Sequence, residues 1–271
     1  MMQAVEGKGF KIPIVGLGTW ALRDVKRIVE QAIRIGYRHI DTAQMYGNEA
    51  EVGQGVHASG VPRGEIMVTT KVQPTHLAPS ELEHSVKQSL AKLRLEYIDL
   101  LLIHWPNPRV PLAETLGAMA KMKREGHVRA IGVSNFTVAL LEEADKVSPE
   151  PVVCNQIECH PFLNQDKVIA ACRKHDMAVV AYSPVARGAA HGNEVLARIG
   201  EAHGKTDAQV SLRYLVQQGI VVIPRTNRLA RLEENFALFD FLLSEQEMQE
   251  IYRLAHPGGR IVDWTWSPKW D

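Results

Sequence analysis

Hydrophobic and polar positions alternate along the chain in two kinds of pattern, which predict helices and strands in turn. The first helical stretch has apolar residues spaced for one face of a helix: Val25, Ile28, Val29, Ala32 and Ile33. Asp24 before it is expected to cap the helix and Gly36 to end it. Residues 37–40 then form a short apolar run, which predicts a buried strand that stops at the polar residue Asp41.

This order repeats through the rest of the chain. Further strands are predicted at residues 66–70, 97–103, 128–133, 152–158, 178–183, 221–224 and 237–241, and further helices at 80–93, 112–124, 193–203 and 244–254. Asn48 is expected to cap the helix after the first strand, with Glu51 completing a capping box. Apolar strands that alternate with amphipathic helices predict a parallel sheet covered on its outside. Eight such strands in 271 residues fit a closed (β/α)8 TIM barrel better than an open doubly wound sheet.

The N-terminal segment carries two features outside this repeat. Residues 1–15 contain two glycines and Pro13 among apolar positions and predict a small β-hairpin that caps the barrel. Residues 16–21 have the spacing of the glycine-rich dinucleotide fingerprint, with Asp41 about 20 residues further on. Such a fingerprint needs a buried strand before it and a helix that opens within it. Because Pro13 breaks the approach and the helix begins only at Asp24, we favour a close-packed turn; a Rossmann dehydrogenase is the alternative.

Composition narrows the possible functions. The 31 basic residues balance 31 acidic ones, so no basic field for nucleic acid or an anionic membrane is expected. The three cysteines lack CxxC spacing, which argues against a disulfide framework and a zinc site: Cys154, Cys159 and Cys172. There is no signal-peptide pattern and no apolar run long enough to span a bilayer. We therefore expect residues 1–271 to form a single soluble, cytoplasmic domain without a metal.

Four chemically active residues fall at the ends of the first three of these predicted strands. Asp41, Lys71 and His104 each end or follow a strand, and Tyr46 lies in the loop after Asp41. Successive strand ends lie side by side on one face of a barrel, so the four side chains are expected to meet there. Lys71, paired with Asp41, is expected to lower the pKa of Tyr46 from about 10 and make it a usable general acid. His104 can hydrogen-bond the oxygen that Tyr46 protonates.

The same four residues could instead have purely structural roles. Asp41 and Lys71 could form a structural ion pair, His104 could be a buried histidine with its hydrogen bonds satisfied within the fold, and Tyr46 could be an aromatic residue of the loop. Each alternative is plausible for one residue alone. The joint placement of all four at the ends of three consecutive strand units favours a site that protonates an oxygen.

Four segments of the chain resemble the signature segments of the aldo-keto reductases. They are GYRHIDTAQMYGNE at 36–49, VTTK at 68–71, LLLIHWP at 100–106 and MKREGHVRAIGVSNF at 122–136, in the family's order. The resemblance implies a (β/α)8 barrel that binds NADPH across its mouth without a Rossmann fold. It implies that Asp41, Tyr46, Lys71 and His104 form the catalytic tetrad, with hydride passing from nicotinamide C4 to the carbonyl carbon. The compact chain is similar to bacterial members that include the 2,5-diketo-D-gluconate reductases.

The resemblance also implies a set of cofactor residues. Those around the nicotinamide are Gly18, Thr19, Trp20, Asp41, Ser134, Asn135, Gln156 and Tyr182. Ser183 begins the loop beside the diphosphate. Those at the adenosine 2′-phosphate and adenine are Arg225, Thr226, Asn227, Arg231, Glu234 and Asn235. Many members have Lys-Ser in place of Arg225-Thr226; arginine remains a forked phosphate donor, so NADP(H) is favoured and NADH remains possible. A solvated basic face is the alternative for these arginines.

The substrate side is expected to be aromatic. Its implied residues are Trp20, Tyr46, His104, Trp105 and Trp264, and Trp266 and Trp270 of the same C-terminal tail could also wall the pocket. The tryptophans of the C-terminal tail could instead pin that tail to the barrel. Short loops favour an open pocket for small aldehydes, dicarbonyls or keto-sugars, and the family implies a monomer that acts on a small-molecule carbonyl. An NADPH-binding structural or regulatory barrel with little turnover is the alternative.

Overall fold

An eight-stranded parallel sheet forms the centre of the computed structural model, which describes residues 3–271. In sheet order its strands are β3 (Leu17–Gly18), β4 (His39–Asp41), β5 (Met67–Val72), β6 (Ile98–Ile103), β7 (Val128–Ser134), β8 (Val152–Glu158), β9 (Ala178–Tyr182) and β10 (Val221–Val222). The first and last strands meet, because the Val222 N–H donates to the Ile14 carbonyl and the Gly16 N–H to the Val222 carbonyl, each at 2.9 Å. The sheet is therefore a closed barrel, and the predicted (β/α)8 fold is confirmed.

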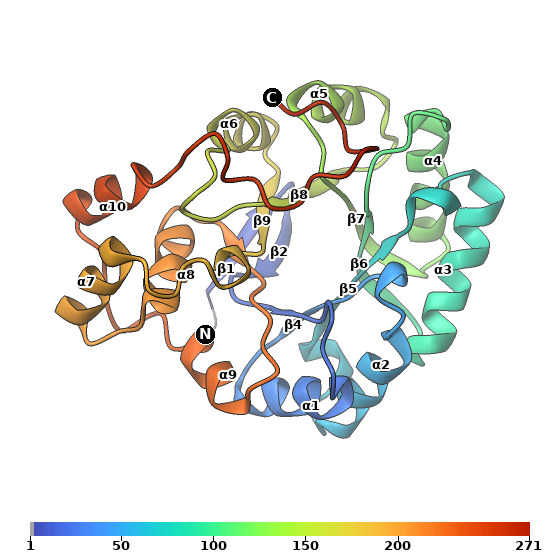
Figure 1. Ribbon diagram of the computed structural model, residues 1–271. Helices are drawn as coiled ribbons and strands as arrows, with labels where there is room; N and C mark the ends of the chain where they lie inside the picture. The colour runs from blue at the N-terminus through green and yellow to red at the C-terminus, as the bar shows by residue number, and fades with distance from the viewer. Residues whose placement is uncertain (1–2) are drawn as a thin grey trace.

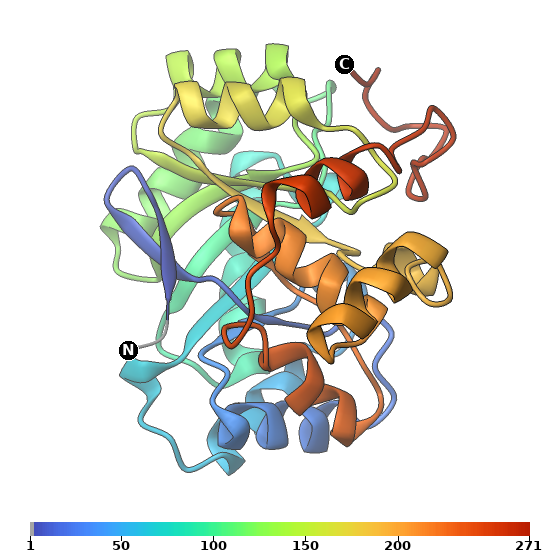
Figure 2. The ribbon, with the colours of Figure 1, turned by 90° about the vertical axis from the view of Figure 1, so that its left-hand side faces the viewer.

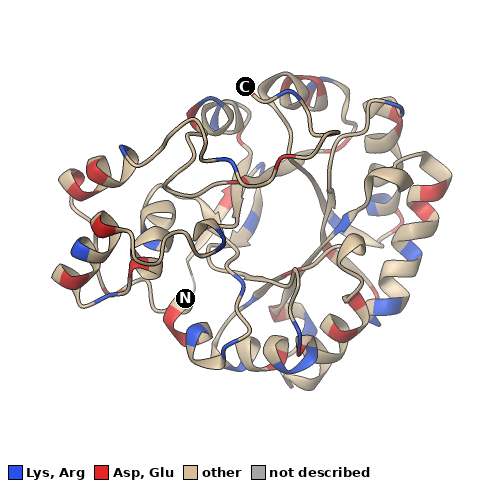
Figure 3. Ribbon diagram, viewed as in Figure 1, with Lys and Arg blue, Asp and Glu red and all other residues tan. Residues whose placement is uncertain are grey.

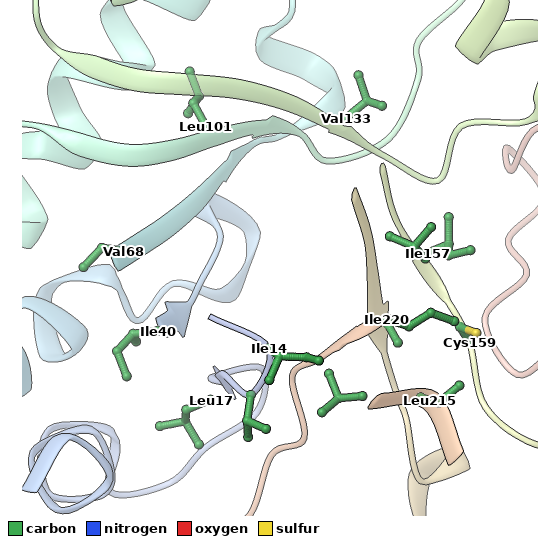
Figure 4. Close-up of a cluster of buried hydrophobic side chains, with 14 of the residues drawn as sticks. Ile14, Leu17, Ile40, Val68, Leu101, Val133, Ile157, Cys159, Leu215 and Ile220 are labelled. Carbon is green, nitrogen blue, oxygen red and sulfur yellow. The ribbon is translucent and has the colours of Figure 1, made fainter. Parts of the chain in front are cut away.

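Helices surround the barrel on its outer face (Figure 1). They are α1 (Val25–Ile35), α2 (Glu49–Ala58), α3 (Pro79–Leu93), α4 (Leu112–Arg124), α5 (Val138–Val147), α6 (Asp166–Lys174), α7 (Glu194–His203), α8 (Asp207–Gln217), α9 (Leu229–Phe236) and α10 (Glu245–Tyr252), with short 3-10 turns η1 (Gln44–Tyr46), η2 (Arg63–Glu65), η3 (Pro74–His76) and η4 (Ala186–Gly188). Apolar strand residues such as Ile40, Val68, Leu101 and Val133 belong to the buried layer between sheet and helices (Figure 4). Removing this layer from water is the main term that stabilises the barrel.

A two-stranded antiparallel hairpin closes one end of the barrel. Its strands are β1 (Ala4–Gly7) and β2 (Phe10–Pro13), and the fully buried Ile12 joins the apolar cluster inside the barrel. Gly7 permits this close approach, because a Cβ there would lie 2.1 Å from the Val153 carbonyl oxygen. Figure 2 shows the hairpin at the opposite end of the barrel from the C-terminal segment. The predicted N-terminal cap is confirmed. A functional site at the mouth of the barrel can therefore form only at the end opposite the hairpin.

The predicted strand at residues 237–241 is wrong. This segment follows α9 without joining the sheet, and its carbonyl groups accept side-chain hydrogen bonds from α8 instead: Gln209 donates to Ala237 at 3.0 Å and Arg213 to Leu238 at 3.2 Å. Leu238 is fully buried in the layer outside the sheet, which accounts for the apolar pattern. The eighth strand of the barrel is β3, which has two residues and no apolar run of its own.

Two predicted side-chain caps are also wrong. Asp24 and Asn48 occupy the N-cap positions of α1 and α2, but neither side chain makes a capping hydrogen bond. The Asn48 amide instead donates to the Thr19 carbonyl at 2.8 Å and accepts from the Thr42 hydroxyl at 2.9 Å. It therefore ties together two loops at the mouth of the barrel. Gly36 ends α1 as predicted, with a φ of +133°.

The glycine-rich segment at residues 16–21 is the close-packed turn favoured from the sequence. A Cβ on Gly16 would lie 2.6 Å from the ring Nδ1 of His39, and one on Gly18 would lie 2.7 Å from the Ile223 carbonyl oxygen. α1 begins only at Val25, after the turn, and the sheet is a barrel. The Rossmann alternative is therefore contradicted.

Two smaller observations bear on the compositional predictions. Cys154, Cys159 and Cys172 are buried free thiols. No helix within residues 3–271 has both the length and the apolar character required to cross a membrane.

Candidate active site

The ends of three neighbouring strands bring the predicted ionisable residues together. Asp41 is the last residue of β4, Lys71 lies near the end of β5, and His104 directly follows β6. The strands β4, β5 and β6 are adjacent in the sheet, and the His104 N–H continues the ladder by donating to the Val72 carbonyl at 3.0 Å. Tyr46 lies in η1, in the loop that follows β4. Parallel strands end at one face of a barrel, so their terminal side chains converge.

Lys71 is the centre of this cluster and is completely buried. Its ammonium Nζ lies 2.5 Å from Oδ1 of Asp41, 2.9 Å from the Thr42 carbonyl oxygen and 3.3 Å from the Tyr46 hydroxyl. These three acceptors use the three donors of an ammonium group. The second carboxylate oxygen of Asp41 accepts from the Gln156 amide at 2.7 Å. Each charge of the pair is therefore hydrogen-bonded on more than one side.

The pKa values of Lys71 and Tyr46 both move upward. Burial by itself lowers the pKa of Lys71, but the charge of Asp41 and the hydrogen bonds raise it above the usual lysine range. Burial raises the pKa of Tyr46, and the opposing charge of Lys71 offsets only part of that effect. The predicted lowering of the Tyr46 pKa is therefore wrong for this structure, because the sequence revealed the ammonium but not the burial. Tyr46 is a protonated phenol at neutral pH.

His104 stands beside Tyr46 at the base of a cleft. The two rings meet edge to face, with centroids 5.6 Å apart. Burial, together with the charge of Lys71, lowers the pKa of His104 well below its usual range. The imidazole is therefore neutral near pH 7 and keeps one N–H to donate to an oxygen in the cleft.

The cleft above these residues has a volume of about 790 Å³ and opens at the carboxyl ends of the strands. Most of the residues predicted from the sequence line it: Gly18, Thr19, Trp20, Asp41, Tyr46, His104, Trp105, Ser134, Asn135, Gln156, Tyr182, Ser183, Arg225, Thr226, Asn227, Arg231 and Trp264. Lys71 lies beneath this lining. Glu234 and Asn235 lie outside it; Glu234 accepts a hydrogen bond from Thr206 at 2.8 Å and Asn235 is buried in α9.

Polar side chains at the ends of β7, β8 and β9 form a continuous network along one wall of the cleft. The Ser134 hydroxyl donates to the Gln156 carbonyl at 2.8 Å. The Asn135 amide donates to the His104 carbonyl at 2.9 Å, and its oxygen accepts from the Tyr182 hydroxyl at 2.7 Å. The network places amide and hydroxyl groups next to the Tyr46–His104 pair, where a polar amide ligand could exchange hydrogen bonds with them.

The C-terminal segment runs from α10 past α6 and β8 to α5 (Figure 1), and Val262, Trp264 and Trp266 from it line the cleft. Glu158, at the end of β8, holds it by accepting from the Ile261 and Val262 N–H groups at 2.6 and 2.8 Å. Beyond this anchor, the indoles of Trp264 and Trp266 stack 6.2 Å apart and nearly parallel, and both line the cleft. Of the three tail tryptophans suggested by the sequence, Trp264 and Trp266 line the cleft, whereas Trp270 lies outside the lining and packs against Trp105 with ring centroids 6.0 Å apart.

Basic residues line the other part of the cleft. Arg225, Arg228 and Arg231 come from the connection between β10 and α9 and from α9 itself, and Arg187 comes from the loop after β9. Figure 3 shows basic positions in blue on the chain that leads into α9. Arg187 was missed as a site residue because nothing in its local sequence pattern distinguishes it from other surface arginines. The loops after β9 and β10 lie together because these strands are adjacent in the sheet, and the closure of the barrel brings the β3 loop with Trp20 next to them.

These features define a class of protein. A closed parallel barrel with a buried lysine, a protonated tyrosine and a neutral histidine beneath an open cleft is the arrangement of a (β/α)8 barrel enzyme that acts on an oxygen-bearing group.

Comparisons with known proteins place the chain more narrowly. The sequence pattern described as the aldo/keto reductase family matches residues 14–256. The chain is 41% identical to the methylglyoxal reductase DkgB of Escherichia coli O157:H7 over 264 residues, which cover 93% of this chain and 99% of the relative. The chain therefore belongs to the aldo/keto reductase family and is an oxidoreductase.

Solved structures agree with this assignment. A crystal structure named, provisionally, as a 2,5-diketo-D-gluconic acid reductase B is 46% identical, with a TM-score of 0.98 over 100% of this chain and 98% of that one. An aldo-keto reductase of Bombyx mori, solved in complex with NADP, is 34% identical, with a TM-score of 0.90 over 97% of this chain and 95% of that one. The similarity thus extends over nearly the whole barrel.

Proposed function

We propose that this protein reduces aldehydes and ketones to alcohols with NADPH, and that Tyr46 is the general acid. The observation that carries the proposal is the contact between the Lys71 ammonium and the Tyr46 hydroxyl, 3.3 Å apart and directly beneath the cleft. A buried cation beside a phenol is of use where the phenol must lose its proton during the reaction.

The cleft suits a phosphorylated dinucleotide. Four arginine side chains line one part of it, and guanidinium groups are forked donors for phosphate. The aromatic ring of Tyr182 and the amides of Asn135 and Gln156 line the part next to the tetrad, as a nicotinamide with its carboxamide requires. When bound, the nicotinamide supplies the hydride. The proposal of NADP(H) is further supported by the Bombyx mori relative solved with NADP.

The chain's own residues then control the proton. Tyr46 donates its phenolic proton to the carbonyl oxygen as negative charge develops there. The positive charge of Lys71 stabilises the phenolate that remains, and Asp41, 2.5 Å from Nζ, keeps Lys71 protonated and in place. The neutral His104 ring donates a hydrogen bond that orients the same oxygen. Tyr46 is reprotonated from solvent through the open cleft.

The proposed substrates are small carbonyl compounds such as dicarbonyls and keto-sugars. The E. coli relative is named a methylglyoxal reductase, which supports a dicarbonyl. The open cleft admits such molecules above Tyr46, between Trp20, Trp105 and Trp264. We further propose that the chain works as a monomer, since each residue of the proposed tetrad comes from one barrel.

The test is NADPH oxidation with a panel of carbonyls that includes methylglyoxal and a keto-gluconate. Tyr46→Phe removes only the acid, and we expect turnover to fall by about 10²- to 10⁴-fold while NADPH binding stays near the wild-type level. Tyr252→Phe is the matched control, because Tyr252 lies on α10, outside the cleft, and its hydroxyl contacts Asp166. Tight NADPH binding without turnover of any carbonyl would favour a binding or regulatory protein. Full activity of Tyr46→Phe would exclude Tyr46 as the acid.

A further inference from the structure

Two arginines from different loops converge on one tryptophan at the cleft. The guanidinium carbon of Arg187 lies 4.9 Å from the ring centroid of Trp20, and that of Arg225 lies 5.1 Å from the same ring. Trp20 follows β3, Arg187 lies in η4 after β9, and Arg225 follows β10. The indole therefore links three loops through cation–π contacts across one part of the cleft.

In the part of the chain that the structure describes, the arginines that line the cleft have no acidic partner. Within residues 3–271, no carboxylate lies within 4.0 Å of a guanidinium nitrogen of Arg187, Arg225, Arg228 or Arg231, although all four line the cleft. Arg187 and Arg225 contact the same indole, so two like charges lie close together, and partial burial with the charge of Arg187 lowers the pKa of Arg225. Unbalanced cations on the wall of a cleft attract anions, and several cations attract an anion of several charges.

The loop that carries Arg187 is held in a defined shape. Ser183, Ala186 and Arg187 all have φ near +50°, a left-handed conformation that costs a non-glycine residue about 1–2 kcal/mol. The Ser211 hydroxyl of α8 donates to the Pro184 carbonyl at 2.7 Å, and the Ala186 N–H donates to the Ser183 carbonyl at 2.8 Å. The turn is thus fastened to α8, and Arg187 is presented to the cleft from a fixed backbone.

Arg187 lies between the two ends of the cleft. On one side it follows Tyr182, whose hydroxyl bonds Asn135 next to the tetrad, and on the other it shares the Trp20 ring with Arg225, which leads toward Arg231 on α9. In a dinucleotide that spans the cleft from the tetrad to α9, the group between the two ends is the diphosphate.

We propose that Arg187 binds the diphosphate of the dinucleotide, and that Trp20 holds Arg187 and Arg225 together as a two-arginine clasp over it. This inference rests on the proposed function. Arg231 and its neighbours on α9 then bind the 2′-phosphate. Different arginines therefore bind the two anionic groups of one cofactor. A forked guanidinium donor suits each phosphate group.

The experiment uses fragments that separate the two anions. ADP-ribose contains the diphosphate and lacks the nicotinamide and the 2′-phosphate, whereas 2′-AMP contains the 2′-phosphate and lacks the diphosphate. Dissociation constants are measured by titration calorimetry for wild type, Arg187→Ala and Arg231→Ala. We expect Arg187→Ala to weaken ADP-ribose, NADH and NADPH by a similar factor of about ten and to leave 2′-AMP within about twofold. Arg231→Ala should weaken 2′-AMP and NADPH while leaving ADP-ribose nearly unchanged.

Further variants test the clasp itself. Arg187→Lys keeps the charge without the fork and should give an intermediate loss for ADP-ribose. Trp20→Leu removes the ring and should also weaken the binding of ADP-ribose. Because ADP-ribose has no nicotinamide, this loss would not come from a contact between Trp20 and the nicotinamide. Arg253→Ala is the matched control, since Arg253 is an exposed arginine that does not line the cleft, and it should change nothing.

The outcomes separate the two proposals. Wild-type protein that binds NADPH, with ADP-ribose affinity unchanged by Arg187→Ala, would overturn the clasp alone. Equal losses of ADP-ribose and 2′-AMP in that variant would also overturn it, since they would indicate a general loss of positive charge. Wild-type protein that binds neither NADPH nor NADH would overturn the proposed function and the clasp with it.

Discussion

Lys71 and Asp41 form an ion pair that is almost completely removed from water: Nζ and Oδ1 are 2.5 Å apart, and the side chains are 0% and 2% exposed. Such a pair is tolerated when its remaining donors and acceptors are satisfied, as they are here by Thr42, Tyr46 and Gln156. Removing one partner leaves the other as a buried charge, which typically costs about 3–5 kcal/mol. Because Lys71 also contacts the Tyr46 hydroxyl, loss of the pair would both destabilise the barrel and change the charge that acts on the Tyr46 proton.

The pH dependence of reduction should follow the raised pKa of Tyr46. Because the acid must be protonated, kcat/KM for carbonyl reduction should stay level between about pH 6 and 9 and fall only at higher pH. In Lys71→Met the opposing ammonium charge is gone, so the falling limb should move to still higher pH while the overall rate drops. A pH–rate profile for both proteins tests this. A limb that moves to lower pH in Lys71→Met would contradict the role of the lysine.

Arg231 should set the preference between the two nicotinamide cofactors. NADPH differs from NADH only in the 2′-phosphate, so Arg231→Gln should raise KM for NADPH about tenfold or more and change KM for NADH much less. Steady-state kinetics with both cofactors measures the ratio, with Arg253→Gln as the control on an exposed site outside the cleft. Equal increases for the two cofactors would remove the 2′-phosphate role.

Glu158 should hold the C-terminal segment over the cleft. Its carboxylate accepts from Ile261 N–H, Val262 N–H and His160 Nε2, the last at 2.9 Å. Glu158→Gln replaces one acceptor oxygen with an NH₂ group that faces a donor, and we expect a loss of about 1–3 kcal/mol in the attachment of the segment. Limited trypsin digestion should then cleave after Arg260 faster than in wild type.

The same variant has a kinetic signature. KM for carbonyl substrates should rise, because Trp264 is released from the rim of the cleft, whereas the Kd for NADPH should stay unchanged. Glu201→Gln is the control, since Glu201 is exposed on α7. An unchanged digestion rate in Glu158→Gln would show that other contacts of the segment, such as the bond from the Val138 N–H to Asp271, are sufficient.

His39 should make the fold sensitive to mild acid. It is fully buried beside Thr69, and burial lowers its pKa to about 4. The unfolded chain takes up a proton near pH 6.5 whereas the folded chain does so only near pH 4, so stability falls as pH drops through this window. The loss amounts to roughly 3 kcal/mol. Urea unfolding at pH 7 and pH 4.5 should show a smaller difference in His39→Gln than in wild type; equal differences would contradict the assignment.

The fold was predictable where the apolar pattern is long enough to recognise. Strands such as β6 and β9 are nearly continuous apolar runs, and their spacing indicated a barrel. β3 escaped detection because a strand of two residues, one of them glycine, leaves no hydrophobic pattern. The apolar segment at 237–241 was mistaken for a strand because burial under a helix selects the same residue types as burial in a sheet.

The sequence predicted which residues form the site better than it predicted their pKa values. Asp41, Lys71 and His104 could be grouped because parallel strands place their ends on one face. The direction of the Tyr46 pKa shift could not be predicted from the sequence. It depends on whether burial or the lysine charge has the larger effect, and burial is a property of the assembled barrel.

The sequence by itself determined the alternation of strands and helices, the family, and the four residues of the proposed tetrad, because each depends on local pattern and on the order of motifs. Tertiary structure alone decided how the barrel closes through Ile14 and Val222, why Tyr46 stays protonated, and which residues meet across the cleft. The meeting of Arg187, Trp20 and Arg225 depends on loops that are far apart in the chain. Contacts of that kind follow from the closure of the sheet, and no periodicity in the sequence encodes them.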